Sequence, residues 1–139
     1  KPVALAEIQA HAEELAARHE LLVMEGVGGW EVPMTEKENF ADLAAALGWP
    51  VILVAANRLG MLNHTLLTER AIRERGLKLV ALVMNHLEEE RDVAMVTNRA
   101  VLTERIEGPL LVEVMPGQDW VEEELVERLR VDCQLSGSP

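Results

Sequence analysis

The amino-acid sequence predicts an α/β fold with three layers, in which a parallel sheet is covered by helices on both faces. Short apolar runs alternate along the chain with longer segments of helical periodicity, as expected for strands joined by helical crossovers. The runs are almost continuously apolar, which is typical of parallel strands buried on both faces. The predicted strands are residues 21–24, 50–55, 79–84 and 110–114.

Helical spacing of apolar residues separates these strands. The predicted helices cover residues 4–18, 40–47, 63–75, 90–106 and 120–129. In the first helix, Ile8 and Leu15 fall on one face and glutamates lie between them. Gly48 and Gly76 follow two of the helices, a position that favours glycine. Asn63 is predicted to cap the third helix, whose free backbone N–H groups would then attract an anion.

Composition and charge exclude several classes of protein. The chain has 139 residues, of which 49% are hydrophobic, and a net charge of -11. This charge argues against non-specific nucleic-acid binding, which needs a basic surface. No apolar run approaches the length of a membrane span, and no signal-peptide pattern opens the chain. The single cysteine, Cys133, cannot form an internal disulfide, so we predict a cytoplasmic protein.

The domain organisation predicted from the sequence is simple. One domain is expected over residues 1–132, followed by a polar tail at residues 133–139 that is expected to be disordered. The first residue is Lys1 instead of methionine, which leads us to expect a processed protein or, in preference, a fragment of a longer one.

Residues 21–30, with the sequence LLVMEGVGGW, carry the main functional signal. The apolar run ends in Glu25, and glycines follow at once. Ligands of open α/β sheets bind at the carboxyl ends of strands, and glycines let a backbone approach a ligand closely. A carboxylate there can hold Mg²⁺ together with the phosphates of a substrate. The alternative interpretation is that Glu25 is a helix cap or a solvated loop residue.

Two other predicted strands also end in turns with polar or glycine residues. Asn85 and His86 follow the third strand, and Pro116, Gly117 and Gln118 follow the fourth. Because the carboxyl ends of parallel strands share one edge of the sheet, these groups and the glutamate of the first strand can converge on one ligand. Asn85 offers the donors and acceptors that an adenine edge requires, and the alternative is a turn or cap asparagine.

Other catalytic and metal-binding patterns are missing from the sequence. His11, His19, His64 and His86 do not have the spacing of a metal site, and we interpret them as structural or solvent-facing. No Ser-His-Asp arrangement is visible, so no catalytic residue is assigned. The sequence contains no Gly-Lys-Ser or Gly-Lys-Thr loop, the device that cradles nucleotide phosphates. A nucleotide site built from this chain alone would lack its strongest phosphate contacts.

Several blocks taken together resemble the C-terminal part of dethiobiotin synthetase. They are EGVGGW at residues 25–30, VP at 32–33, LGWPVILV at 47–54 and RLGMLNHTLLT at 58–68. By the order of blocks, the similarity runs from about Ala4 to about Glu123. The resemblance implies a homodimer with a P-loop NTPase-like fold that is incomplete at its N-terminal part. It also implies an enzyme that uses ATP and Mg²⁺ to carboxylate 7,8-diaminononanoate with CO₂, phosphorylate the carbamate and close the ureido ring of dethiobiotin in biotin biosynthesis.

The resemblance further implies roles for individual residues. Glu25 would bind magnesium. The residues matching the ATP-binding positions are Glu25, Gly26, Val27 and Gly28 beside the phosphates, Asn85 and His86 at the adenine, Pro116, Gly117 and Gln118 along the base, and Glu123. The residues matching the helix N-terminus that receives the substrate's carboxylate across the dimer interface are Gly60, Met61, Leu62 and Asn63.

The phosphate loop, catalytic lysine and second magnesium carboxylate of the family have no counterpart in these 139 residues. We therefore expect this polypeptide to be inactive by itself. One alternative is a non-catalytic nucleotide-binding or dimerisation remnant. Another is the nucleotide domain of a cobalamin-pathway amidoligase, although the block at residues 63–68 favours dethiobiotin synthetase.

Overall fold

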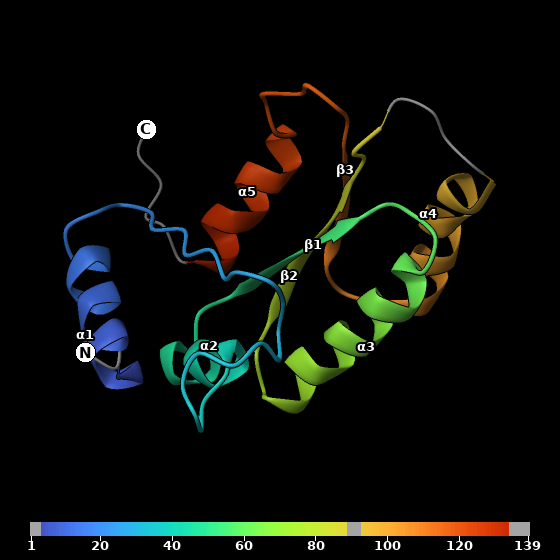
Figure 1. The fold of residues 1–139 in the computed structure, drawn as a ribbon. Coiled ribbons are helices and arrows are strands. Elements are labelled where there is room, and N and C mark those ends of the chain that lie inside the picture. Colours follow the sequence, from blue (N-terminus) through green and yellow to red (C-terminus); the bar gives the residue numbers. More distant parts are fainter. Residues whose placement is uncertain (1–3, 89–92, 134–139) are drawn as a thin grey trace. The chain divides into compact units, whose positions relative to one another are not determined.

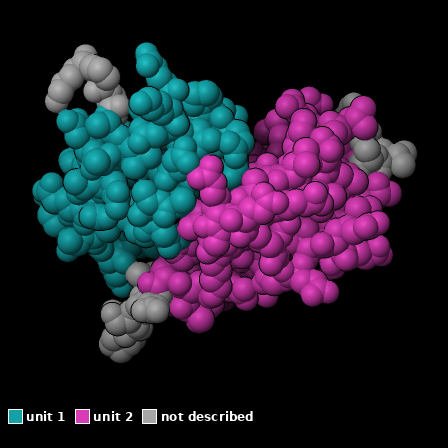
Figure 2. Space-filling view, turned by 90° about the horizontal axis from the view of Figure 1, so that it is seen from below, with its two compact units in different colours: residues 1–49 teal, residues 50–139 magenta. Residues whose placement is uncertain are grey.

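A computed structural model describes residues 4–88 and 93–133 (Figure 1). The chain divides into two compact units, Lys1–Trp49 and Pro50–Pro139, which Figure 2 colours separately. The single domain predicted over residues 1–132 stays a prediction. Among the described residues, no helix combines the length and the apolar character needed to span a membrane.

The second unit contains a sheet of three parallel strands. Their order is β1 (Val51–Ala56), β2 (Leu79–Asn85) and β3 (Leu110–Val114). In the register, Leu82 of β2 lies between Leu53 of β1 and Leu111 of β3. All residues of β2 except Asn85 are buried, as its unbroken apolar run predicts for a central strand. The three strands predicted in this region are confirmed, with ends that shift by at most one residue.

Helices cover both faces of this sheet, as predicted (Figure 1). α3 (Met61–Glu74) and α4 (Val93–Arg105) lie on one face, and α5 (Glu123–Asp132) lies on the other. Successive residues of a strand point to opposite faces, so β2 supplies both layers of the core. Leu82 and Met84 pack with Met61, Leu102 and Ile106 on one side, and Ala81 and Val83 pack with Val112 and Leu125 on the other.

The structure corrects the predicted starts of two helices. α3 begins at Met61 with Gly60 as its N-cap, so the prediction that Asn63 caps this helix is wrong. Gly60 adopts a φ of 90°, which a residue without a Cβ tolerates, and the chain can therefore enter the helix before Asn63. α5 begins at Glu123 instead of residue 120. α4 begins at Val93, and the predicted helical residues 90–92 lie outside the described residues.

The described part of the first unit, residues 4–49, contains two helices, α1 (Leu5–Ala16) and α2 (Phe40–Leu47). α2 starts with a capping box, because the Asn39 side chain accepts from the Asp42 N–H and the Asp42 carboxylate accepts from the Asn39 N–H, each at 2.9 Å. It ends at Gly48, whose φ of 65° is the left-handed cap that the sequence predicts. In α1, Ala12 is the buried residue.

The predicted strand at residues 21–24 is not formed. This segment has no strand assignment, and Leu21, Val23 and Met24 expose 46%, 71% and 41% of their surfaces. A strand needs a hydrogen-bonded neighbour, and the described part of the first unit offers no strand beside it. The only bridge in this unit joins Pro33 to Asn39 within the described residues. Apolar character alone was therefore not sufficient to predict a sheet position.

Asp132 joins the C-terminal end of α5 to Lys78, which directly precedes β2. Its carboxylate accepts from Lys78 Nζ at 2.6 Å and from Arg128 Nε at 2.6 Å, and Arg128 also donates to the Gly108 carbonyl at 2.8 Å. The hydrogen bond from Lys78 is the main cause that lowers the pKa of Asp132; burial opposes it and Arg128 adds to it. Cys133, predicted to belong to the tail, is the half-buried C-cap of α5, and residues 134–139 lie outside the described residues.

Asp132→Asn should lower the free energy of unfolding by about 1 kcal/mol near neutral pH, because it weakens both ion pairs. The folded pKa of Asp132 is below its ordinary value of 3.8, so this contribution is complete above that value and is lost as the pH falls through the folded pKa. Urea titrations at several pH values measure the difference between the two proteins. Glu127→Gln, which removes an exposed pair with Arg130, is the control. A difference that grows on acidification would contradict this prediction.

Candidate functional site

The carboxyl ends of β1, β2 and β3 meet at one edge of the sheet. Ala56 pairs with Asn85, and Asn85 pairs with Val114. Two hydrogen bonds continue the pairing: Asn57 N–H donates to the Asn85 carbonyl at 2.8 Å, and His86 N–H donates to the Val114 carbonyl at 2.9 Å. Both polar atoms of the peptide between Asn85 and His86 are therefore held by neighbouring strands.

Asn85 and His86 point to opposite faces of the sheet. Residues of β2 alternate, so Asn85 lies on the same face as Val83, which packs against α5. The Asn85 side chain is half-buried and makes no hydrogen bond to any residue that the structure describes. Its amide is therefore available to a ligand on the α5 side of the sheet.

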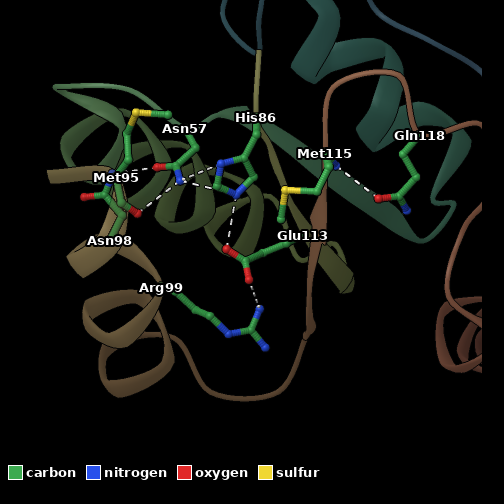
Figure 3. A network of polar contacts seen from close by, with 8 residues as sticks. All are labelled: Asn57, His86, Met95, Asn98, Arg99, Glu113, Met115 and Gln118. Carbon is green, nitrogen blue, oxygen red and sulfur yellow. Dashed lines mark hydrogen bonds and ion pairs between the residues drawn. The ribbon is translucent and has the colours of Figure 1, made fainter. Parts of the chain in front are cut away.

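The ring of His86 is buried on the other face, beside α4, and only 2% of the residue is exposed (Figure 3). His86 Nε2 lies 3.1 Å from Glu113 Oε1, and Glu113 Oε2 accepts from Arg99 at 3.1 Å. The Asn57 amide nitrogen lies 3.4 Å from His86 Nδ1. These partners support the structural interpretation of His86. The nucleotide contact that the resemblance assigns to it stays a prediction.

Asn57 and Asn98 extend this buried network into α4. Asn98 Nδ2 donates to Asn57 Oδ1 at 2.7 Å, and Asn57 Nδ2 donates to the Met95 carbonyl at 3.2 Å (Figure 3). Asn57, Asn98, Glu113 and Arg99 are not among the site residues predicted from the sequence. For Asn57 a weaker signal existed, because only Ala56 separates it from the end of a predicted strand. Asn98, Glu113 and Arg99 carry no such signal, because their roles depend on contacts between distant segments.

The loop after β3 is held in shape by Gln118. Its N–H donates to the Met115 carbonyl at 3.1 Å, its Oε1 accepts from Met115 N–H at 3.1 Å, and its Nε2 donates to the Trp120 carbonyl at 2.8 Å. Gly117 adopts a φ of 73°, which the turn requires. Pro116 and Gly117 are exposed. This loop connects β3 to α5, whose first residue is the exposed Glu123.

The N-terminus of α3 has no side-chain cap. Met61 N–H donates to the Arg58 carbonyl at 3.0 Å, and His64 N–H donates to the Gly60 carbonyl at 3.3 Å. The first N–H groups of a helix otherwise have no partner inside the helix, and the helix dipole favours an anion there. Met61 is buried, Leu62 is half-buried, and Gly60 and Asn63 are exposed.

The candidate phosphate and magnesium residues belong to the first unit. Glu25, Gly26, Val27 and Gly28 lie in an exposed loop. Gly26 lies against the Phe40 ring, where an added Cβ would be 3.3 Å from the nearest ring atom, and Gly28 has a φ of 88°. Within the described residues, no cluster of three or more His, Cys, Asp or Glu side chains forms a metal site. The other candidate residues belong to the second unit, so convergence of Glu25 with them stays a prediction.

The parallel sheet with helices on both faces and the polar groups at its strand ends are consistent with a P-loop NTPase-like α/β protein. A family model described as an AAA domain matches residues 1–123, and the chain belongs to this family.

The relatives of the chain define the resemblance more closely. It is 48% identical over 118 residues to the ATP-dependent dethiobiotin synthetase BioD of Akkermansia muciniphila, covering 84% of this chain and 55% of that protein. It is 47% identical over 100 residues to the protein of the same name from Anaeromyxobacter dehalogenans, covering 72% of this chain and 45% of that protein. The chain thus spans about half the length of these curated relatives. The predicted resemblance to dethiobiotin synthetase is confirmed.

Proposed function

We propose that this chain is part of an ATP-dependent dethiobiotin synthetase and that it binds the adenine base of ATP and the carboxylate of the diamine substrate. The whole enzyme would carboxylate 7,8-diaminononanoate with CO₂, phosphorylate the carbamate and close the ureido ring in biotin biosynthesis. The observation that supports this most strongly is the 48% identity to a dethiobiotin synthetase over 84% of the chain.

The α5 side of the sheet suits a nucleobase. The Asn85 amide has both a donor and an acceptor to offer, and its peptide is held by β1 and β3. An amide side chain on a fixed backbone binds a base edge with a smaller loss of conformational entropy. Pro116, Gly117 and Gln118 follow β3, lead to α5, and would line the base, and Glu123 would meet the nucleotide. This arrangement supports adenine recognition without a basic surface, which a chain of net charge -11 does not have.

Glu25 would supply one carboxylate oxygen to Mg²⁺. Magnesium commonly takes one or two carboxylates and completes its shell with water and substrate phosphates, so one carboxylate is sufficient for this role. Gly26, Val27 and Gly28 would place backbone next to the phosphates. Magnesium bound in this way would neutralise charge on the transferred phosphoryl group.

The uncapped N-terminus of α3 would receive the carboxylate of the diamine. Gly60, Met61, Leu62 and Asn63 form this turn, and free N–H groups at a helix start bind carboxylates well. In the proposed homodimer, this turn of one subunit would face the active site of the other. We place the enzyme in the cytoplasm.

NMR titrations of the isotope-labelled chain test this function. Adenosine monophosphate should shift the signals of the Asn85 side chain and of Gly117, and guanosine monophosphate should shift them less. Asn85→Asp, which keeps the size but loses the amide donor, should weaken adenosine monophosphate binding about tenfold. Gln9→Ala, which removes an amide in α1, is the control and should leave binding unchanged.

The same spectra test the substrate. 7,8-Diaminononanoate should shift the backbone signals of Leu62 and Asn63, whereas a diamine of similar length without a carboxylate should not. Equal shifts with both diamines would contradict the assigned carboxylate site and would favour another ATP-dependent ligase. Equal shifts with both nucleotides, or none at Asn85, would contradict the assigned adenine site.

A further inference from the structure

We propose that Asn57 is a positioning residue for the nucleobase and that it fixes the segment that presents Asn85. This inference rests on the proposed adenine site. Asn57 touches no predicted ligand. It acts through the backbone of Asn85 and through the ring of His86.

The backbone of Asn57 holds one side of the Asn85–His86 peptide. Its N–H donates to the Asn85 carbonyl at 2.8 Å, while the N–H of the same peptide donates to Val114 at 2.9 Å. A peptide bonded on both sides cannot rotate without breaking one of these bonds. The direction in which the Asn85 side chain points therefore depends on the position of the Asn57 backbone.

The side chain of Asn57 fixes residue 57 itself. The residue is 2% exposed. Its side-chain Oδ1 accepts from Asn98 at 2.7 Å, and its side-chain Nδ2 donates to the Met95 carbonyl at 3.2 Å. Both partners belong to α4. A short loop after β1 is thereby tied to a helix that packs on the sheet core.

The remaining donor of the Asn57 amide faces His86. The amide nitrogen lies 3.4 Å from His86 Nδ1 and 3.5 Å from His86 Nε2. Nε2 also lies 3.1 Å from the carboxylate of Glu113, so the His86 ring is held between Asn57 and Glu113 (Figure 3). Both the side-chain oxygen and the side-chain nitrogen of Asn57 thus have partners in α4. Its orientation is determined by this set of partners, because a flipped amide would place its oxygen against the Met95 carbonyl.

The two variants that test this role are Asn57→Ala and Asn57→Asp. Asn57→Asp keeps the shape and the acceptor for Asn98 but places oxygen against the Met95 carbonyl and His86 Nδ1. The experiment uses the full chain and the same buffer for all variants. In both variants, binding of adenosine monophosphate should weaken about fivefold to tenfold, since a mobile Asn85 must be ordered by the ligand. Hydrogen exchange of the His86 amide should become faster.

Asp132→Asn is the matched control, because it destabilises the same unit at the far end of β2, near Lys78. It should leave nucleotide affinity and the ring nitrogen signals of His86 unchanged, whereas both Asn57 variants should change the Nδ1 signal. If the wild-type chain binds adenosine monophosphate and the Asn57 variants bind it equally well, the positioning role is wrong and the proposed adenine site stands. If the wild-type chain shows no shift at Asn85, the adenine site fails, and this inference fails with it. If Asn57→Ala does not fold, the isosteric Asn57→Asp still tests the positioning role.

Discussion

The 139-residue polypeptide is expected to form no measurable ADP from ATP, Mg²⁺, bicarbonate and 7,8-diaminononanoate. Phosphoryl transfer is accelerated by preorganised backbone donors and a lysine around the phosphates, and the sequence contains no Gly-Lys-Ser or Gly-Lys-Thr loop to supply them. Each missing donor costs orders of magnitude, so the rate should be at least ~10³-fold below that of a complete enzyme. A coupled assay for ADP measures the rate of ADP formation.

The dethiobiotin synthetase of Akkermansia muciniphila, 48% identical over the shared region, is a suitable positive control in the same assay. Turnover by the purified chain that is abolished by Glu25→Gln would contradict the prediction, because the acidic loop would then be sufficient for phosphoryl transfer. Turnover that Glu25→Gln does not affect would point to a contaminating ATPase.

Leu82→Ala is expected to lower the free energy of unfolding of the second unit by about 3 kcal/mol. Leu82 is 1% exposed at the centre of β2 and packs with Met61, Leu102 and Ile106, so truncation leaves a cavity that helices on a sheet cannot easily close. A loss of this size is a large fraction of the stability of a small unit. Urea unfolding followed by circular dichroism measures it.

Leu59→Ala is the control for Leu82→Ala. Leu59 is 82% exposed, so the same truncation should change the free energy of unfolding by less than about 0.5 kcal/mol. If the two variants lose similar stability, the packing of α3 and α4 on β2 is not as described. Because the chain has two units, the unfolding curve is first tested for two transitions.

The fold of the second unit could be predicted from the sequence because burial there repeats a simple pattern. β2 is apolar at every position from Leu79 to Met84, and such a run forms a strand once neighbours such as β1 and β3 pair with it. Residues 21–24 have a similar pattern but no partner strand in the described part of their unit, and Leu21, Val23 and Met24 remain exposed. Hydrogen bonding to a neighbour depends on residues far away in the sequence, so a local pattern cannot supply it.

Some residues of the candidate site could likewise be predicted from the sequence, and others could not. Asn85 was selected because it follows a strand, and the structure does place it at an edge shared by three strand ends. Asn57 directly follows β1 but is not among the predicted site residues. Its role depends on Asn98 and Met95, which are about forty residues away and join it through α4.

The sequence by itself determined the order of helices and strands in the second unit, the family, and the polar residues at the strand ends of that unit, because these follow from local periodicity and from recognisable blocks. The tertiary structure alone decided which of these polar groups are free to bind a ligand. Asn85 and His86 are neighbours that both carry polar side chains. The side-chain amide of Asn85 has no protein partner among the described residues, whereas the ring of His86 is enclosed by Asn57 and Glu113. The reason is physical: alternation along β2 turns one side chain toward α5 and the next toward α4, where buried polar atoms must find partners.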